Sequence, residues 1–318
     1  MVSKIKTIAI VLLIVAMAFL IVSPSMLAEE KLEPLPFEVK TKAPKPNPAN
    51  YSADSLSYKD ASIEVKGRWD RAFDTDYLVF VVKIKDISQF RAIPANGVSF
   101  KADNEMLGAT IAKRANAVFA INGDYFVFDS YGFAVRQGKV LRRKPNGEDV
   151  LIVDEKGHFH TILKASSYSK IKPELSELEN KGVKIYNAFS FGPTLIKDNE
   201  ILIPDGKKYQ YMNVGAQRLA QRISLTQVGE LEYLVVSTCG PDNKGSKGLT
   251  IRQIAELTHK IANELYPEKG AMISYNLDGG SSNTVVMQNK KVNSPGSKTR
   301  PLSDMICFMT LVREENQK

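Results

Sequence analysis

The sequence predicts an α+β fold: a mixed, largely antiparallel sheet with a few packed helices. Short apolar or alternating stretches typical of strands recur along the chain, and few helical stretches interrupt them. Two pairs of such stretches, "GFAVRQGKVLR" and "DVLIVDEKGHFHTIL", indicate hairpins that turn at Gly138 and Gly157. Strands and helices do not alternate regularly, as they would in a doubly wound parallel fold.

Residues 1–28 are predicted to be a signal sequence or an N-terminal membrane anchor. "MVSKIK" supplies two lysines, and residues 7–22 form an unbroken apolar run. An uncleaved anchor is favoured, because Pro24 separates the small residues Ser23 and Ser25 at the cleavage spacing. In both cases the lysines stay inside and the rest of the chain is exported. We therefore expect a protein that is membrane-anchored with its domain outside the cell, or secreted.

Residues 29–50 are predicted to be a linker, because prolines at 34, 36, 44, 46 and 48 favour an extended, stiff chain. Residues 51–318 are predicted to form the globular domain. The composition of the whole chain, 43% hydrophobic and 25% charged, is that of an ordinary globular protein.

Along this domain the patterns predict strands and helices in a definite order. Strands are expected at 62–69, 76–86, 117–121, 231–239, 271–277, 284–287 and 305–312. A helix is expected at 103–116 with Asp103 as its N-cap, and another at 172–182 with Pro173 in its first turn. The best-marked helix follows Thr250, which forms a capping box with Gln253.

The formal net charge of +8 favours polyanionic partners, namely anionic lipid headgroups or phosphate-bearing wall polymers. Nucleic acid is not an expected partner, because no zinc finger, helix-turn-helix pattern or aromatic-basic RNA motif is present. The two cysteines, Cys239 and Cys307, are too few for a disulfide scaffold. Two buried free thiols are expected, with one disulfide as the alternative if their strands are neighbours.

No metal site is predicted. His158 and His160 share one face of a hairpin that we expect at the surface, and His259 lies beside the polar face of a helix. A catalytic zinc site usually needs two or three histidines and a further ligand. No cofactor is predicted, and a divalent cation such as calcium is the one alternative left open.

Two motifs place polar residues after an apolar run. "AINGDYF" covers residues 120–126, and "YNLDGGSSNTVVM" covers residues 275–287. Each can be a strand-end turn, and the second a tight hairpin in which Asp278 bonds its own backbone. If the two strand ends meet, Asp124 and Asp278 become paired carboxylates, as glycoside hydrolysis requires. Asn122 and Asn276 would then bind hydroxyl or phosphate oxygens, and Arg222 or Arg300 would contact a phosphate.

Four blocks of the sequence together resemble the phosphodiester glycosidase family. They are "AINGDYF", "FSFGPTLIKDNE" (189–200), "QRISLTQVGE" (221–230) and "YNLDGGSSNTVV", in the family's order. The chain departs from the family at four positions. Asp124 and Ser281 stand where the family has glycine, Asn283 where it has serine and Gln221 where it has proline. Asp278 is therefore a stronger catalytic candidate than Asp124.

The resemblance implies a hydrolase outside the cytoplasm that cleaves a sugar from a glycosyl phosphodiester in a surface glycan, exopolysaccharide or wall polymer. It implies Asp278 and Arg222 as catalytic residues, and the paired-carboxylate pattern adds Asp124 as a third candidate. The predicted substrate-binding residues are Asn122, Gly123, Asn276, Gly279, Gly280, Ser282, Gly192 and Arg300. Two other functions stay open: a non-catalytic surface module that binds anionic glycopolymers, and a phosphodiesterase that acts at phosphorus.

Overall fold

The computed structural model describes residues 32–100, 104–124, 130–206, 209–211 and 214–313. One compact unit begins at Pro34 and contains the globular domain. The apolar run at 7–22, which we predicted to be an anchor or signal, lies outside the described residues. Among the residues described, no helix has the length and apolar character needed to cross a membrane.

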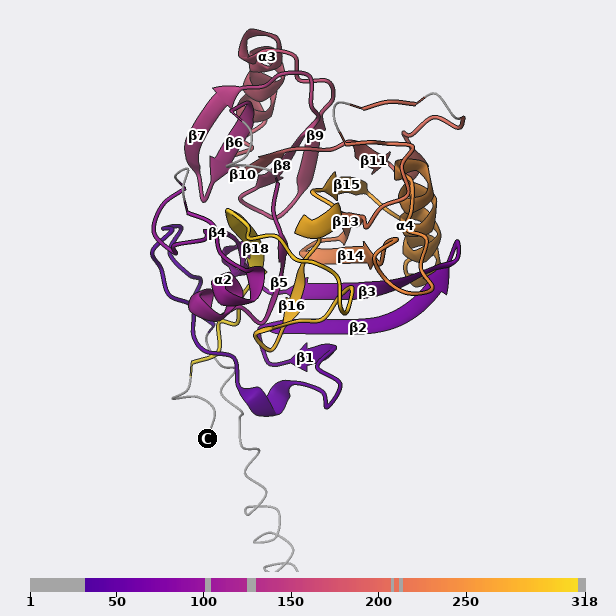
Figure 1. The fold of residues 1–318 in the computed structure, drawn as a ribbon. Coiled ribbons are helices and arrows are strands. Elements are labelled where there is room, and N and C mark those ends of the chain that lie inside the picture. Colours follow the sequence, from indigo (N-terminus) through magenta and orange to yellow (C-terminus); the bar gives the residue numbers. More distant parts are fainter. Residues whose placement is uncertain (1–31, 101–103, 125–129, 207–208, 212–213, 314–318) are drawn as a thin grey trace, which may run out of the picture. The chain divides into compact units, whose positions relative to one another are not determined.

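The strands form three antiparallel sheets (Figure 1). The first has eight strands in the order β1-β2-β3-β14-β13-β15-β11-β12. Their bounds are Ser57–Lys59, Ile63–Ala72, Thr75–Ile84, Glu232–Thr238, Ile223–Gly229, Ile273–Leu277, Thr194–Lys197 and Glu200–Ile201, in the same order. The predicted strands at 62–69 and 76–86 belong to this sheet. The strands at 232–238 and 273–277 belong to it as well.

The other two sheets have five strands each. One has the order β7-β6-β10-β8-β9, with bounds Lys139–Lys144, Gly132–Arg136, Ile185–Ser190, Val150–Asp154 and Phe159–Ile162. The other has the order β17-β16-β5-β18-β4, with bounds Lys290–Lys291, Val285–Met287, Phe119–Asn122, Asp304–Phe308 and Phe90–Pro94. The α+β class is confirmed, but three sheets replace the single expected sheet. Every pairing among the described strands is antiparallel.

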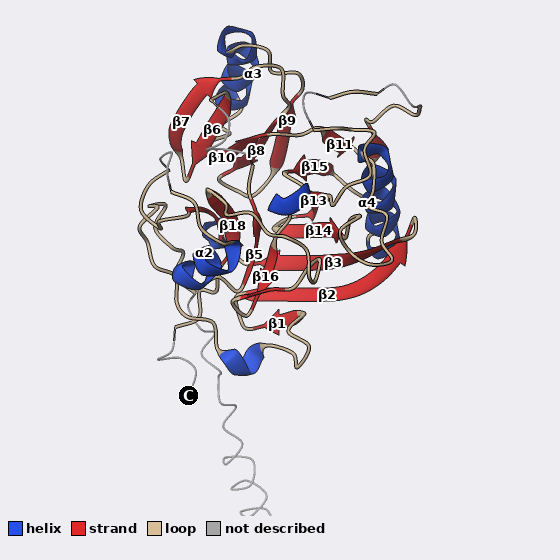
Figure 2. Ribbon diagram, viewed as in Figure 1, coloured by secondary structure: helices blue, strands red, loops and turns tan. Residues whose placement is uncertain are grey.

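Each sheet carries one α-helix, as Figure 2 shows. Helix α4 (Ile251–Leu265) contacts β11 and β13, and its predicted capping box of Thr250 and Gln253 is confirmed. Helix α2 (Gly108–Ala115) packs on β18, and it is shorter than the expected 103–116. Its N-cap is Leu107, which makes no side-chain cap, whereas Asp103 lies outside the described residues.

Helix α3 (Tyr168–Asn180) begins earlier than the expected 172, so Pro173 lies inside it and not in its first turn. Ile171 packs with the core of the β6–β10 sheet. The expected start was wrong because Pro173 was taken to mark it. Three short 3-10 helices complete the described structure: η1 (Pro48–Asn50), η2 (Ile87–Gln89) and η3 (Gly280–Ser282).

One hydrophobic core joins the three sheets. Phe80 of the eight-stranded sheet packs against Phe119 of β5, with 4.8 Å between ring centroids. Phe159 of β9 stacks on Tyr233 of β14 at 5.3 Å. Because the same buried cluster contains residues from all three sheets, the strand ends around it are held in fixed relative positions.

The proline-rich segment is not a free spacer as far as residue 50. Leu35 and Ala43 are buried, and the backbone from Pro34 onward belongs to the compact unit. Arg91 Nη1 donates to the Pro36 carbonyl at 3.0 Å, and Asn116 Nδ2 donates to the Ala43 carbonyl at 2.8 Å. Residues 34–50 of the predicted 29–50 linker therefore belong to the compact unit.

The disulfide alternative is wrong: Cys239 and Cys307 are both buried free thiols. Cys239 follows β14 of the eight-stranded sheet, whereas Cys307 lies on β18 of another sheet. Burial raises the pKa of both thiols, which makes them poor nucleophiles near neutral pH.

We therefore predict that Cys307→Ala lowers the free energy of unfolding by about 1 kcal/mol. Urea titration followed by circular dichroism measures this loss. In the wild-type protein, Cys307 should react with a thiol reagent only after unfolding. Labelling of Cys307 in the native state would contradict its assignment as a packing residue.

Candidate active site

The two polar motifs meet at one place. Strand β5 ends at Asn122, and Asn122 Nδ2 donates to the main-chain carbonyl of Asp278 at 2.8 Å. The Thr284 N–H donates to Asn122 Oδ1 at 3.1 Å. The loop after β15 does not turn back into a hairpin, since β16 joins β5 in a different sheet. The hairpin interpretation is therefore wrong, and one asparagine ties both ends of the crossing loop.

Asp278 lies immediately after β15 and is largely buried but not fully enclosed. Burial raises the pKa of its carboxyl group to about 6, and the nearby Asp124 adds to this. The Ser282 hydroxyl, Arg300 and the Gly279 N–H oppose the increase, because they stabilise the carboxylate. A carboxyl group that titrates near neutral pH can take up or release a proton during a reaction.

Gly279 allows the loop to lie against the main chain that precedes β13. A Cβ atom at Gly279 would be 2.5 Å from the Gln221 carbonyl oxygen, which is closer than any real contact. The same carbonyl accepts a hydrogen bond from the Gly280 N–H at 3.0 Å. The glycine pair therefore fixes the position of Asp278 through close backbone packing.

We predict that Gly279→Ala displaces this loop and lowers the free energy of unfolding by about 1–3 kcal/mol, since the clash is with main chain. Any turnover that depends on Asp278 should fall with it. Gly138→Ala is the matched control: its φ is +78° and no atom lies within 4 Å of the added Cβ, so only backbone strain results. Equal activity of both variants would show that the Gly279 contact does not position the site.

Asn276 is fixed by the block that contains Gly192. Asn276 Nδ2 donates to the Gly192 carbonyl at 2.7 Å, and the Asn276 N–H donates to the Pro193 carbonyl at 3.0 Å. Asn276 Oδ1 is buried and has no hydrogen-bond partner within the described part of the chain. A buried acceptor of this kind costs free energy unless a donor reaches it.

Arg222 is held differently from the expected phosphate ligand. Its guanidinium donates to the carbonyls of Leu249, Val214, Gly215 and Arg218 at 2.8–3.1 Å. Burial, together with Arg218, lowers its pKa to about 10, so it remains charged at neutral pH. A phosphate could bind these four N–H groups only if their hydrogen bonds to the backbone carbonyls were broken. The structure thus gives Arg222 a positioning role at the start of β13.

Asp124 is also held by the protein itself. Its Oδ1 accepts from Arg136 Nη2 at 2.7 Å, and its Oδ2 accepts from the Ser190 N–H at 2.9 Å. Arg136 is completely buried and also contacts Asp304, with Nη2 3.2 Å and Nε 3.3 Å from Asp304 Oδ2. The expected pairing of Asp124 with Asp278 is replaced by a buried triad of Asp124, Arg136 and Asp304.

Sequence reasoning missed Asp304 and Arg136. Burial raises the pKa of the Asp304 carboxyl, Arg136 opposes this and Asp124 adds to it, because one guanidinium serves two carboxylates. Asp304 also lies against Gly123, where a Cβ atom would be 2.6 Å from Asp304 Oδ1. Charges inside strands that are otherwise apolar, Arg136 in "GFAVRQ" and Asp304 before "MICF", were the available signal.

The Ser282 hydroxyl and the positive charge of Arg300 both lower the pKa of the Asp278 carboxyl group. The Arg300 N–H donates to the Ser281 carbonyl at 2.9 Å, which ties the 294–303 loop to the Asp278 loop. No group of three or more His, Cys, Asp or Glu residues within the described ranges has a metal-binding arrangement. His158 and His160 both contact Asp154, at 3.4 and 3.1 Å.

The model of the phosphodiester glycosidase family matches residues 115–309, which is more than half of the chain. This chain belongs to the phosphodiester glycosidase family. The matched range contains every part of the site described above, from Asn122 to Asp304. No curated protein matches this family member.

Among solved structures, this phosphodiester glycosidase family member is similar to the catalytic domain of zebrafish N-acetylglucosamine-1-phosphodiester alpha-N-acetylglucosaminidase, auto-inhibited by its pro-peptide. The TM-score is 0.59 at 16% identity, over 85% of this chain and 87% of that chain. A hypothetical protein from Synechocystis gives a TM-score of 0.54 at 15% identity, over 78% of this chain and 62% of that chain. At these identities the likeness shows the shared fold.

Proposed function

We propose that this protein is a hydrolase that acts outside the cytoplasm and cleaves a sugar from a glycosyl phosphodiester in a surface glycan or wall polymer. The observation that carries the proposal is the Asp278 carboxyl group, with its pKa raised to about 6, at the point where two strand ends meet. Family membership supports the reaction class, and the related zebrafish enzyme is named for a sugar phosphodiester substrate.

In the proposed reaction, the bond between the anomeric carbon and the phosphate oxygen breaks. Water supplies the new oxygen on the sugar, and its proton leaves through Asp278. The other product is a phosphomonoester, whose second pKa near 6 makes it a leaving group that needs little protonation. The main task left for Asp278 is therefore to activate water, or to stabilise positive charge on the sugar, in its ionised form. Because its pKa is about 6, Asp278 is mostly ionised at pH 7.

Other residues support this arrangement. Arg300 supplies positive charge near the carboxylate, where it can also face the phosphodiester. Asn276 holds the Gly192 loop to the end of β15, and Asn122 keeps the Asp278 loop in place. We assign Arg222 and the Asp124–Arg136–Asp304 triad to positioning, because their polar atoms bind the protein itself.

A product assay distinguishes the proposal from the two other functions. Purified protein is incubated with an α-glycosyl phosphodiester, such as an N-acetylglucosamine-phosphate methyl ester, and the products are separated by chromatography. We expect free sugar and a phosphomonoester. Sugar phosphate as the product would indicate attack at phosphorus. Binding of anionic glycopolymer without turnover, under conditions where the protein is folded, would indicate a non-catalytic module.

We further propose that the domain is exported and tethered through its N-terminal segment. The lysine-flanked apolar run at 7–22 supports this. Protease added to intact cells should digest the domain, while a cytoplasmic control protein stays intact. Protection of both proteins until the cells are lysed would place the domain inside.

A further inference from the structure

A cavity of about 650 Å³ opens beside the end of the β2–β3 hairpin. Its walls include Trp69, Asp70, Arg71, Asp76, Cys239 and Lys244. We propose that this cavity binds a further sugar unit of a glycan whose phosphodiester bond lies at Asp278. The inference rests on the proposed function, and it specifies the substrate as an oligomeric or polymeric glycan.

The cavity and Asp278 lie at the same end of successive strands in the eight-stranded sheet. Leu277, which precedes Asp278, pairs with Ile223, and Ile223 pairs with Ser237. Ser237 pairs with Leu78, and Leu78 pairs with Trp69. Neighbouring strands are about 4.8 Å apart, so Trp69 lies roughly 19 Å from the end of β15.

The wall of the cavity is connected to the Asp278 loop through Gln221. Cys239 is followed by Gly240, where a Cβ atom would be 2.5 Å from Gln221 Cγ. The Gln221 carbonyl accepts from the Gly280 N–H. Gln221 thus contacts both the residue that follows Cys239 and the loop that carries Asp278. The ends of β14 and β15 are two strand spacings apart, or roughly 10 Å. A glycan bound along these strand ends would span a few sugar units between the Trp69 cavity and Asp278.

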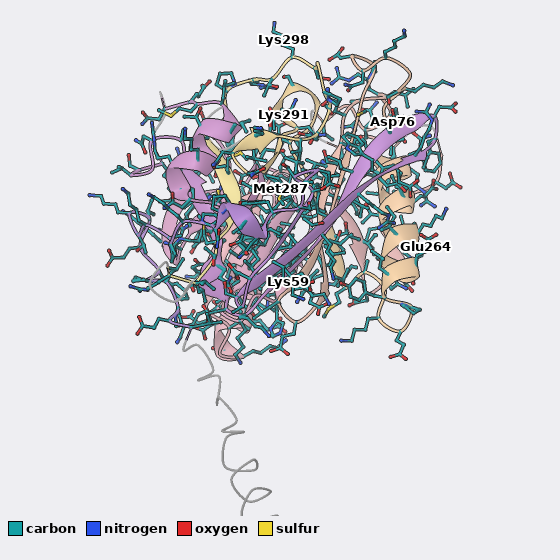
Figure 3. All side chains as sticks on the ribbon, turned by 90° about the horizontal axis from the view of Figure 1, so that it is seen from below. Lys59, Asp76, Glu264, Met287, Lys291 and Lys298 are labelled. Carbon is teal, nitrogen blue, oxygen red and sulfur yellow. The ribbon has the colours of Figure 1, made fainter. Side chains whose placement is uncertain are left out.

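The 295–300 loop also connects the Trp69 cavity with the Asp278 loop. Asn243 Nδ2 donates to the Pro295 carbonyl at 2.9 Å, and the Ser297 hydroxyl donates to Asn243 Oδ1 at 2.9 Å. The chain then reaches Arg300, which acts on the Asp278 carboxyl group. Figure 3 shows Lys298 of this loop on the same side of the molecule as Asp76. The 295–300 loop therefore borders the path from the cavity to Asp278.

The chemistry of the cavity suits a neutral sugar. Trp69 is the one tryptophan in the chain, and its side chain is 40% exposed in spite of its size. A sugar ring presents apolar C–H groups that can stack on an indole, while its hydroxyls need polar partners at the rim. Arg71 and Asp76 form an ion pair at 2.6 Å, which provides fixed donors and acceptors there.

The charged residues that line this cavity differ from those that line a second cavity. Two acidic and two basic residues, Asp70, Asp76, Arg71 and Lys244, line the Trp69 cavity. This second cavity, of about 500 Å³, is lined by Lys42, Lys45, Arg114 and Arg313 with no acidic residue, and it suits an anion. The balanced charge at Trp69 leaves stacking and hydroxyl contacts as the main source of affinity.

Because the chain has a single tryptophan, its fluorescence reports on this cavity alone. A glycan array first identifies glycans that bind the intact chain, and the best of them is titrated while tryptophan emission is recorded. We expect saturable quenching or a shift of the emission. Trp69→Ala should weaken binding of the same glycan roughly tenfold, which corresponds to one aromatic stacking contact. Calorimetry measures this affinity, since the variant has no tryptophan.

Phe73→Ala is the matched control, because Phe73 is 44% exposed on the same hairpin but does not line the cavity. It should bind like the wild type. Asp278→Asn should also keep this binding while it loses turnover, which separates a failure of the proposed reaction from a failure of this inference. The inference is overturned if no glycan on the array binds in a Trp69-dependent way, or if binding leaves the emission of Trp69 unchanged.

Discussion

Replacement of Asp278 by Asn is expected to reduce sugar release by about 10²–10⁴-fold, the usual contribution of general acid–base catalysis. Asn keeps the size of the side chain, so the hydrogen bond from Asn122 to the carbonyl of residue 278 is retained. The loss comes from the missing carboxylate, which can no longer accept a proton from water. Steady-state release of free sugar from an α-glycosyl phosphodiester measures the effect.

Asp198→Asn is the control for this substitution. Asp198 is exposed in the turn between β11 and β12, where its φ is +52°, a conformation that Asn adopts readily. It lies beyond the start of β15, since Lys197 pairs with Ile273, whereas Asp278 follows the end of that strand. The control should keep full activity. A folded Asp278→Asn variant with near wild-type turnover would remove Asp278 from the mechanism.

The Asp278→Asn variant also tests the raised pKa of the Asp278 carboxyl group. The Asp278 carboxyl has a pKa of about 6 when folded, against 3.8 for an ordinary Asp, so the folded state favours the protonated form. As pH rises from about 4 to about 6, ionisation of the wild type progressively costs stability. Asp278→Asn should therefore be more stable than the wild type at pH 8, by about 1–3 kcal/mol, and similar to it at pH 4. Urea unfolding at the two pH values measures the difference.

Removal of Arg136 is expected to cause the largest loss of stability, about 3–5 kcal/mol for Arg136→Met. Arg136 is fully buried between Asp124 and Asp304, and both carboxylates would be left without their cation. The loss should be larger at pH 8 than at pH 5, because the unpaired carboxyls can become protonated at the lower pH. Denaturant unfolding at both pH values measures it.

Two further variants show whether charge is the cause. Arg143→Met removes an exposed arginine from the neighbouring strand β7 and should change stability by only about 0.5 kcal/mol. Asp124→Asn and Asp304→Asn added to Arg136→Met remove all three charges, so much of the stability should return. If the triple variant is no more stable than Arg136→Met, the loss comes from packing and the triad is not an electrostatic unit.

The sequence by itself determined the features that depend on near neighbours. The capping box of Thr250 and Gln253 joins residues three positions apart, so it was visible in the sequence. The turns at Gly138 and Gly157 have positive φ angles, which glycine adopts without strain. The strand that ends before Asp278 was predicted from its apolar run. Helix α3 shows the limit of such local signals, because packing extended it past the point that Pro173 suggested.

Only the tertiary structure decided what the polar residues contact. Whether the Asp278 loop forms a hairpin or crosses to another sheet depends on the partner that β16 finds, and that partner is β5. Arg222 has the residue type of a phosphate ligand, but its donors bind nearby carbonyls once that loop folds over it. Arg136 and Asp304 are 168 positions apart and meet only because their sheets share one core. Hydrogen bonds and ion pairs depend on distances of about 3 Å, and for distant residues packing alone sets those distances.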